Sequence, residues 1–469
     1  MSGSEPPARG RPGRAGGART YGSGARILSV GIASTGLLTF AYFSIASHVL
    51  PGAAAKRIDL LWSVMFVIIS VIYRPIEQLL SRTIAQQRAQ GRHEHAMRVP
   101  MLIQAGFALL FLALALALRE PLLRVFDHYE ALYWVLLAGT LAYAASYFAR
   151  GWLAGHQRFA LFGALVLMES LSRLCFAVAV AVGIASGQTA VALGIAAAPF
   201  VSLVVVPAAF AARRGERSRA QLEGPITVDE ADAALAGPGA EGVQEAAAHD
   251  DLSLRRGGGF ALSVSAIMLS EQALLNAAVL TVDATSSNAS LAGIVFNVLL
   301  IARAPLQLFQ AIQTSLLPHL TGLEATDGHE AFARAVRVTV LAIGAFAALV
   351  SLVLLAVGPF LMRHVLFGQQ YPYGAAGLAL IGVGMGLHLI SGALNQAALA
   401  RDRARTAAAC WLLAAAVFVA WTIVPAISDL LLRVEVGYAG ATALLALALT
   451  LLYRSGSRQL AATEAASVA

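Results

Sequence analysis

Long apolar runs separated by short polar segments extend over most of the 469-residue chain. A helix needs about 20 apolar residues to cross the hydrocarbon core of a bilayer, and each of these runs is of that order. We count twelve runs, at residues 27–50, 60–80, 100–118, 131–149, 159–184, 189–212, 260–282, 291–317, 336–362, 375–400, 406–427 and 436–453. The pattern predicts an all-α polytopic membrane protein with twelve transmembrane helices.

The composition agrees with this class. Hydrophobic residues make up 58% of the chain and charged residues 13%, whereas a soluble domain carries about 25% charged residues. A single water-exposed domain could not hide so much apolar surface. Residues 1–26 are rich in Gly, Pro and Arg and hold no apolar segment of a signal peptide, so we expect a disordered, basic cytoplasmic tail.

The basic residues predict the orientation of the helices. With the N-terminus placed in the cytoplasm, 24 of the 33 Lys and Arg residues fall in cytoplasmic segments, 6 in outside loops and 3 within spans. Basic residues favour the cytoplasmic side of a membrane protein, so both termini are predicted to be cytoplasmic. The same placement explains the net charge of +7 without a nucleic-acid partner.

A polar segment divides the chain in two. Residues 213–259 have no apolar period and predict a flexible cytoplasmic linker. Six spans precede it, in residues 27–212, and six follow it, in residues 260–453; residues 454–469 form a second cytoplasmic tail. YRPIE at 73–77 is similar to RAPLQ at 303–307, and LAGHQ at 153–157 to LARDR at 399–403. We therefore expect two six-helix bundles related by a parallel pseudo-two-fold repeat.

Several stretches carry a family resemblance. They are RPIEQLLSRTIA at 74–85, ARGWLAGHQRF at 149–159, LLIARAPLQLFQAIQTSLLPHL at 299–320, LFG at 366–368 and GALNQAALARDRAR at 392–405. Together they resemble the polysaccharide or oligosaccharide exporters (lipid-linked oligosaccharide flippases) of the multidrug/oligosaccharidyl-lipid/polysaccharide flippase superfamily. The resemblance implies two bundles facing a central cavity, with alternating access moving a lipid-linked sugar across the bilayer.

Two arginines within the spans are candidates for binding this substrate. Arg74 and Arg303 occupy similar places in the two halves, and a guanidinium can hold a diphosphate by charge-assisted hydrogen bonds. The alternative is an arginine whose charge reaches the membrane surface along its own flexible side chain. Pro75 and Pro305 follow these cations and predict either a hinge or a static kink in each helix.

Other polar residues within the spans could face the same cavity. Glu169 and Arg173 have the i,i+4 spacing of an ion pair on one helix face, which is structural or substrate-facing. His388 and Asn395 could bind sugar hydroxyls or be satisfied core residues. The remaining candidates are Glu77 and a polar stripe of Asn297, Gln307, Gln310 and Gln313 on the eighth span, which could equally join helices.

Glu271 is the only acidic residue within the seventh span, and Gln272 and Asn276 lie beside it. A buried carboxylate can carry a coupling proton, or bind Na⁺ together with amide oxygens. An interhelical hydrogen bond is the competing interpretation.

We expect a flippase or exporter for an undecaprenyl diphosphate-type oligosaccharide or a cell-envelope polysaccharide precursor, in the bacterial cytoplasmic membrane. Its partners would be that lipid-linked sugar, membrane lipids, and a glycosyltransferase or polymerase of an envelope polysaccharide pathway. Two alternatives stay open: a cation-coupled multidrug antiporter of the same superfamily, whose drug efflux depends on Glu271, and a non-transporting membrane scaffold for surface-polymer assembly. No Walker A motif occurs and the carboxylates of the outside loops are scattered, so we expect neither an enzyme nor a cofactor or metal site.

Overall fold

The computed structural model describes residues 31, 34–90, 97–204, 254–285, 295, 298–299, 305, 309, 313–325, 328–362 and 374–468. The helices of the first half are α2 (Gly52–Ile72), α3 (Arg74–Ala89), α4 (Arg98–Ala117), α5 (Arg119–Val125), α6 (Glu130–Gly155), α7 (Phe159–Ala181) and α8 (Gly187–Ser202). Those of the second half are α12 (Leu254–Thr285), α14 (Gly328–Phe360), α15 (Ala375–Ala400), α16 (Ala404–Ile423) and α17 (Leu430–Val468). Residues 34–49 and 313–325 are also helical.

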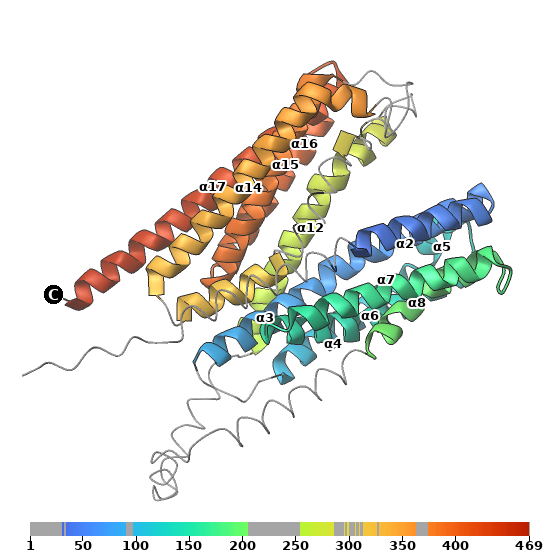
Figure 1. Ribbon diagram of the computed structural model, residues 1–469, viewed down its shortest axis with the longest axis horizontal. Coiled ribbons are helices and arrows are strands. Elements are labelled where there is room, and N and C mark those ends of the chain that lie inside the picture. The colour runs from blue at the N-terminus through green and yellow to red at the C-terminus, as the bar shows by residue number, and fades with distance from the viewer. Residues whose placement is uncertain are drawn as a thin grey trace, which may run out of the picture.

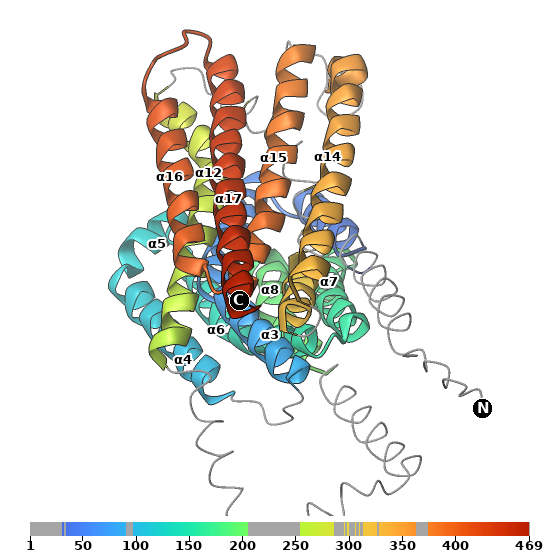
Figure 2. The ribbon, with the colours of Figure 1, turned by 90° about the vertical axis from the view of Figure 1, so that its left-hand side faces the viewer.

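The helices form two groups, which we call the N bundle (34–204) and the C bundle (254–468). In the N bundle, α3 packs on α6, and α7 and α8 pack on each other. In the C bundle, α15 lies between α14 and α17, and α12 packs on α16 (Figures 1 and 2). Helix α12 also contacts α2, α3 and α4, so it carries much of the contact between the bundles.

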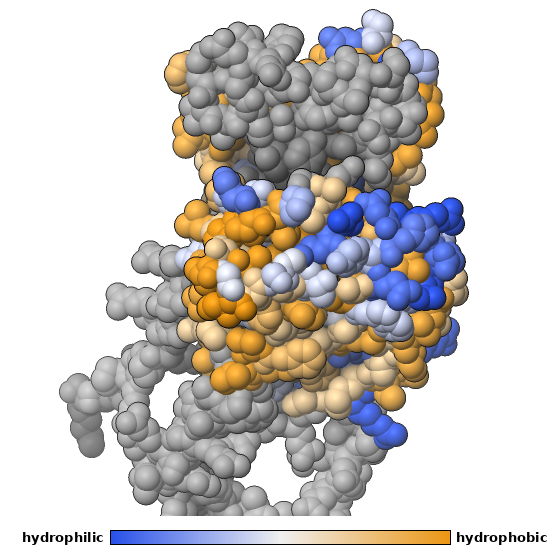
Figure 3. All heavy atoms as spheres, turned by 90° about the vertical axis from the view of Figure 1, so that its right-hand side faces the viewer, coloured by the Kyte–Doolittle hydropathy of each residue, from blue (hydrophilic) through white to orange (hydrophobic). Residues whose placement is uncertain are grey.

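The surface of the described helices requires a lipid environment. Within the described residues, eight helices are long and apolar enough to cross a membrane: α4, α6, α7, α12, α14, α15, α16 and α17. In α4 and α14 only 22% of the most apolar window is buried, and Leu109 and Leu352 are 65% and 63% exposed. Apolar side chains cover a broad area beside a polar patch (Figure 3). Water would make such surfaces costly, whereas acyl chains solvate them.

The predicted second span is not one continuous helix. α2 ends at Ile72, and α3 begins at Arg74 with Pro75 in its first turn, where the missing N–H of proline costs no helical hydrogen bond. α3 continues to Ala89, and Arg74 lies at the junction of two successive helices.

Two glycines let α6 approach α3 closely. A Cβ at Gly151 would lie 2.9 Å from the backbone oxygen of Glu77, and one at Gly155 would lie 2.7 Å from Cβ of Ile84. Small residues one turn apart are typical of tightly packed membrane helices. The glycines therefore determine how deeply Glu77 is buried between the two helices.

The turns α6–α7 and α15–α16 have the same geometry. Gln157 and Asp402 both adopt a φ of 58° in the left-handed region. In both turns the next residue donates its N–H to the carbonyl five residues earlier, at 2.9 Å. This places Gln157 opposite Asp402, whereas the sequence comparison placed it opposite Arg403. The repeat is present in these turns, with a register one residue away from the predicted alignment.

Candidate functional site

Arg74 lies where the two bundles meet. It lines a cavity of about 10 Å³ with Glu77, Gln78 and Ser81 of α3 and with Gln313, Thr314 and Leu317 of the C bundle. The lining is mostly polar and comes from both bundles, but the space holds no more than a water molecule. Several predicted positions lie outside the described residues: Arg303, Asn297, Gln307, Gln310 and the LFG at 366–368. Pro305 is described and is half-buried in a helical backbone.

In the C bundle, a carboxylate faces an imidazole. Oε1 of Glu271 on α12 lies 4.0 Å from Nε2 of His388 on α15, and both side chains are buried. The other ring nitrogen, Nδ1, lies 3.2 Å from the hydroxyl of Tyr438 on α17. Nε2 makes no hydrogen bond to any residue that the structure describes. When Tyr438 donates to Nδ1, the neutral ring carries its proton on Nε2, facing the carboxylate.

The neighbouring predicted residues have partners inside the C bundle. Asn395 is buried, and its Oδ1 accepts a hydrogen bond of 3.2 Å from Nε1 of Trp411. Asn276 donates to the backbone oxygen of Gln272 at 2.9 Å and to its side-chain oxygen at 3.2 Å. These contacts favour a packing role for Asn395 and place the Asn276 side chain against its own helix.

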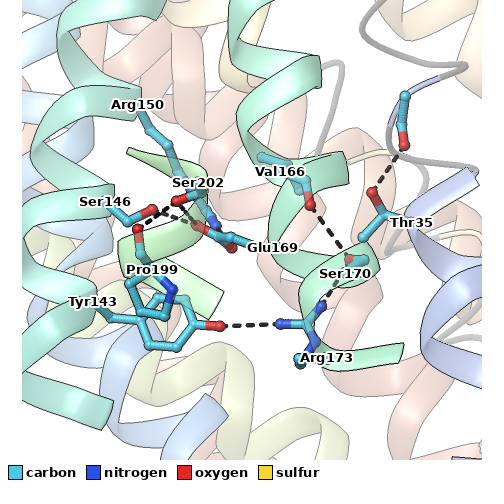
Figure 4. Close-up of polar contacts among 11 residues, drawn as sticks. Thr35, Tyr143, Ser146, Arg150, Val166, Glu169, Ser170, Arg173, Pro199 and Ser202 are labelled. Atoms are coloured by element: carbon cyan, nitrogen blue, oxygen red, sulfur yellow. Dashed lines mark hydrogen bonds and ion pairs between the residues drawn. The ribbon is translucent and has the colours of Figure 1, made fainter. Parts of the chain in front are cut away.

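The N bundle buries a second polar cluster (Figure 4). Glu169 on α7 is 2% exposed and forms an ion pair with Arg150 on α6. It also accepts a hydrogen bond from Ser146, and Oγ of Ser202 on α8 lies 3.4 Å from Oε1. The Arg150 guanidinium lies 4.4 Å from the centre of the Tyr147 ring. The cluster therefore joins α6, α7 and α8 through one carboxylate.

The possible i,i+4 ion pair of Glu169 with Arg173 does not form. Arg173 donates to the hydroxyl of Tyr143 at 3.0 Å and to Oγ of Ser170 at 2.8 Å (Figure 4). Its guanidinium also lies 4.6 Å from the centre of the Trp62 ring. The ion pair of Glu169 is formed with Arg150 instead.

That cation, Arg150, directly follows the span predicted at residues 131–149. Helix α6 runs five residues beyond it, to Gly155, and Arg150 lies within the bundle. The sequence contains a pattern that indicates this longer helix. The segment GWLAG at 151–155 continues the apolar character of the span, so the helix does not end at Arg150.

Arg74 connects the two clusters electrostatically. It interacts with Glu77 of its own bundle and with Glu271 of the C bundle. Glu77 in turn interacts with Arg150 and Glu169. Buried charges interact strongly because few water molecules screen them. The charges of Glu77 and Glu271, one from each bundle, are therefore both close enough to Arg74 to be attracted by it.

Comparison with known protein families finds no match, and no curated protein sequence matches the chain. Solved structures do match. A mutant of the Vibrio cholerae MATE transporter VcmN aligns with a TM-score of 0.72 at 16% identity, over 94% of this chain and 97% of that one. An outward-facing multidrug resistance MATE family transporter of the MOP superfamily aligns with a TM-score of 0.68 at 14% identity, over 97% and 98%. The MATE transporter ClbM in complex with Rb⁺ aligns with a TM-score of 0.69 at 14% identity, over 92% and 94%.

This likeness confirms the predicted fold class, an all-helical membrane protein with twelve transmembrane helices in two bundles. The neighbours belong to the MATE transporters of the MOP superfamily, the multidrug/oligosaccharidyl-lipid/polysaccharide flippase superfamily that the sequence resembles. Membership of the exporter branch stays a prediction, as does the orientation of the termini.

Proposed function

We propose that the chain is an alternating-access secondary transporter that couples proton entry to the export of an organic substrate, in the cytoplasmic membrane of a bacterium. The observation that carries the proposal is the buried pair of Glu271 and His388, with Nε2 and Oε1 4.0 Å apart. The fold supports it, since MATE transporters share the architecture and one of them is described as a multidrug resistance transporter.

The pair is suited to binding and releasing one proton. An ionised carboxylate at membrane depth costs several kcal/mol unless it is compensated. A proton bound by Glu271 removes this cost and also removes its attraction to Arg74 of the other bundle. Without the attraction between Arg74 and Glu271, the contact of α3 with α12 is weaker, and the bundles can rearrange. Proton binding and substrate release are in this way linked to the same movement.

The test uses the purified protein in liposomes with an imposed pH gradient and ethidium as the organic cation. We expect gradient-driven ethidium transport, which Glu271→Gln lowers about 5- to 150-fold, the range of a coupling free energy of about 1–3 kcal/mol. His388→Gln should have an effect in the same direction. Glu130→Gln is the control, because Glu130 is exposed and forms its ion pair with Arg119, at 2.8 Å, within the N bundle. Ethidium transport that does not depend on the pH gradient, or that is unchanged in Glu271→Gln, contradicts the coupling of proton entry to export through Glu271.

A lipid-linked oligosaccharide is the second candidate substrate. Arg74 favours it, because a guanidinium beside polar residues of both bundles suits a diphosphate. In that case an envelope glycosyltransferase or polymerase is the expected partner, and the polar lining at the interface contacts the headgroup.

This candidate has its own experiment. We expect transfer of a fluorescent lipid-diphosphate-linked oligosaccharide across vesicles. The double variant Arg74→Gln, Arg303→Gln should lower it about a hundredfold or more, since each of the two charge-assisted bonds contributes about 1.5–3 kcal/mol. The amount of folded protein, measured by size-exclusion chromatography, should stay unchanged. Transfer at the wild-type rate would contradict the proposal that Arg74 and Arg303 bind the diphosphate.

A further inference from the structure

An ion pair joins the two bundles at the end where α3 terminates. Nη1 of Arg82 on α3 lies 3.0 Å from Oδ1 of Asp402 in the α15–α16 turn. The Arg82 guanidinium also lies 5.2 Å from the centre of the Phe260 ring on α12. One side chain of the N bundle thus contacts two elements of the C bundle, one by charge and one by its flat face.

The pair lies between two cavities. A cavity of about 440 Å³ lies between α3 and the ends of helix 313–325 and α15, and a cavity of about 80 Å³ lies between α3 and α12. Arg82 and Asp402 line both, together with Gln86 and Gln90. Polar side chains therefore surround the pair on both sides, and water can replace its bonds when the bundles part.

Deeper in the interface the contact is apolar. Ile76, Leu79 and Ile103 of the N bundle belong to the same packed core as Phe260 and Val264 of the C bundle. Such apolar contacts stabilise the association of the bundles but do not fix their relative orientation. The ion pair lies at their polar rim, so it adds a directional contact to this closed interface.

The backbone holds Asp402 in place for this contact. Its φ of 58° is a conformation that Asp and Asn adopt more readily than most residues. The Asp402 side chain is 61% exposed, whereas that of Arg82 is 14% exposed. A carboxylate on a tight turn thus reaches a cation held against the other bundle, and a half-solvated pair of this kind breaks readily.

We propose that Arg82 and Asp402 form a latch that holds the two bundles together at this end, the predicted cytoplasmic end, and that opens when access changes sides. The inference rests on the proposed alternating access. The Arg82–Asp402 pair stabilises the closed form relative to the separated form at this end.

The test measures the distance between the bundles directly. Spin labels at Ala160→Cys on α7 and Thr406→Cys on α16, both exposed, would be introduced into the full chain after Cys175→Ala and Cys410→Ala. Asp402→Asn keeps the turn conformation and removes the charge. We expect it to raise the ratio of separated to closed molecules about two- to fivefold, the range for a partly exposed ion pair. Arg82→Met should raise the ratio at least as much.

The double variant Arg82→Met, Asp402→Asn decides whether the two residues act as a pair. In a latch, Asp402→Asn has no further effect once Arg82 is absent. Glu130→Gln, which breaks an exposed ion pair within the N bundle, should leave the distances unchanged. Unchanged distances in Asp402→Asn, or additive effects in the double variant, overturn the latch even when proton-driven transport is intact. Loss of the pH-gradient dependence with the expected distance changes would instead count against the proposed function alone.

Discussion

Arg150→Met is expected to lower the free energy of unfolding by about 3–5 kcal/mol, the cost of leaving one partner of a buried ion pair without the other. Glu169 is 2% exposed, and its ion pair with Arg150 is what compensates the carboxylate charge. Ser146 and Ser202 supply hydrogen bonds but no charge. The measurement is the unfolding temperature of the purified protein in detergent, followed by tryptophan fluorescence.

The double variant Arg150→Met, Glu169→Gln is the control for this result. It removes both charges and keeps an amide that can bond to the serines, so most of the lost stability should return. An Arg150→Met protein as stable as the wild type would mean that the carboxylate is neutral or is compensated elsewhere. A double variant that is no better than Arg150→Met would mean that packing of the arginine matters more than its charge.

Gly155→Leu is expected to lower the free energy of unfolding by about 1–3 kcal/mol, because the new side chain has no space. Its Cβ alone would lie 2.7 Å from Cβ of Ile84 and 3.1 Å from the backbone oxygen of Ser81. The α3–α6 contact must then open, which also exposes Glu77. The same unfolding measurement applies.

Gly106→Ala is the matched control for the glycine substitution. Gly106 lies within α4, and an added Cβ would meet no atom within 4 Å. Alanine is the better helix former by about 0.5–1 kcal/mol, so this variant should be as stable as the wild type or slightly more so. If Gly106→Ala and Gly155→Leu destabilise equally, the close approach of α3 and α6 is not what requires glycine at position 155.

Much of the fold could be predicted from the chain. Apolar runs of membrane-spanning length predicted α4, α6, α7 and α12, and the motif similarities predicted two related halves. Helix ends were harder to predict. Hydropathy averages over many residues, so it did not separate α2 from α3 at Tyr73, where Pro75 allows a new helix to begin.

The candidate site was less predictable than the fold. Glu169, Arg173, Glu271 and His388 stood out because a charge or imidazole within an apolar span needs a partner. Their partners did not follow from the same rule. Spacing on one helix suggested Arg173 for Glu169, whereas the ion pair comes from Arg150 on another helix.

The sequence by itself determined the membrane class, the helical content and the repeat, because these depend on local hydropathy and on residues close together in the chain. Only the tertiary structure decided which polar and charged side chains meet. The contacts of Glu271 with His388 and of Arg82 with Asp402 join residues 117 and 320 positions apart. Such contacts depend on how helices rotate and pack against one another, and small residues such as Gly151 and Gly155 set that packing without any charge of their own.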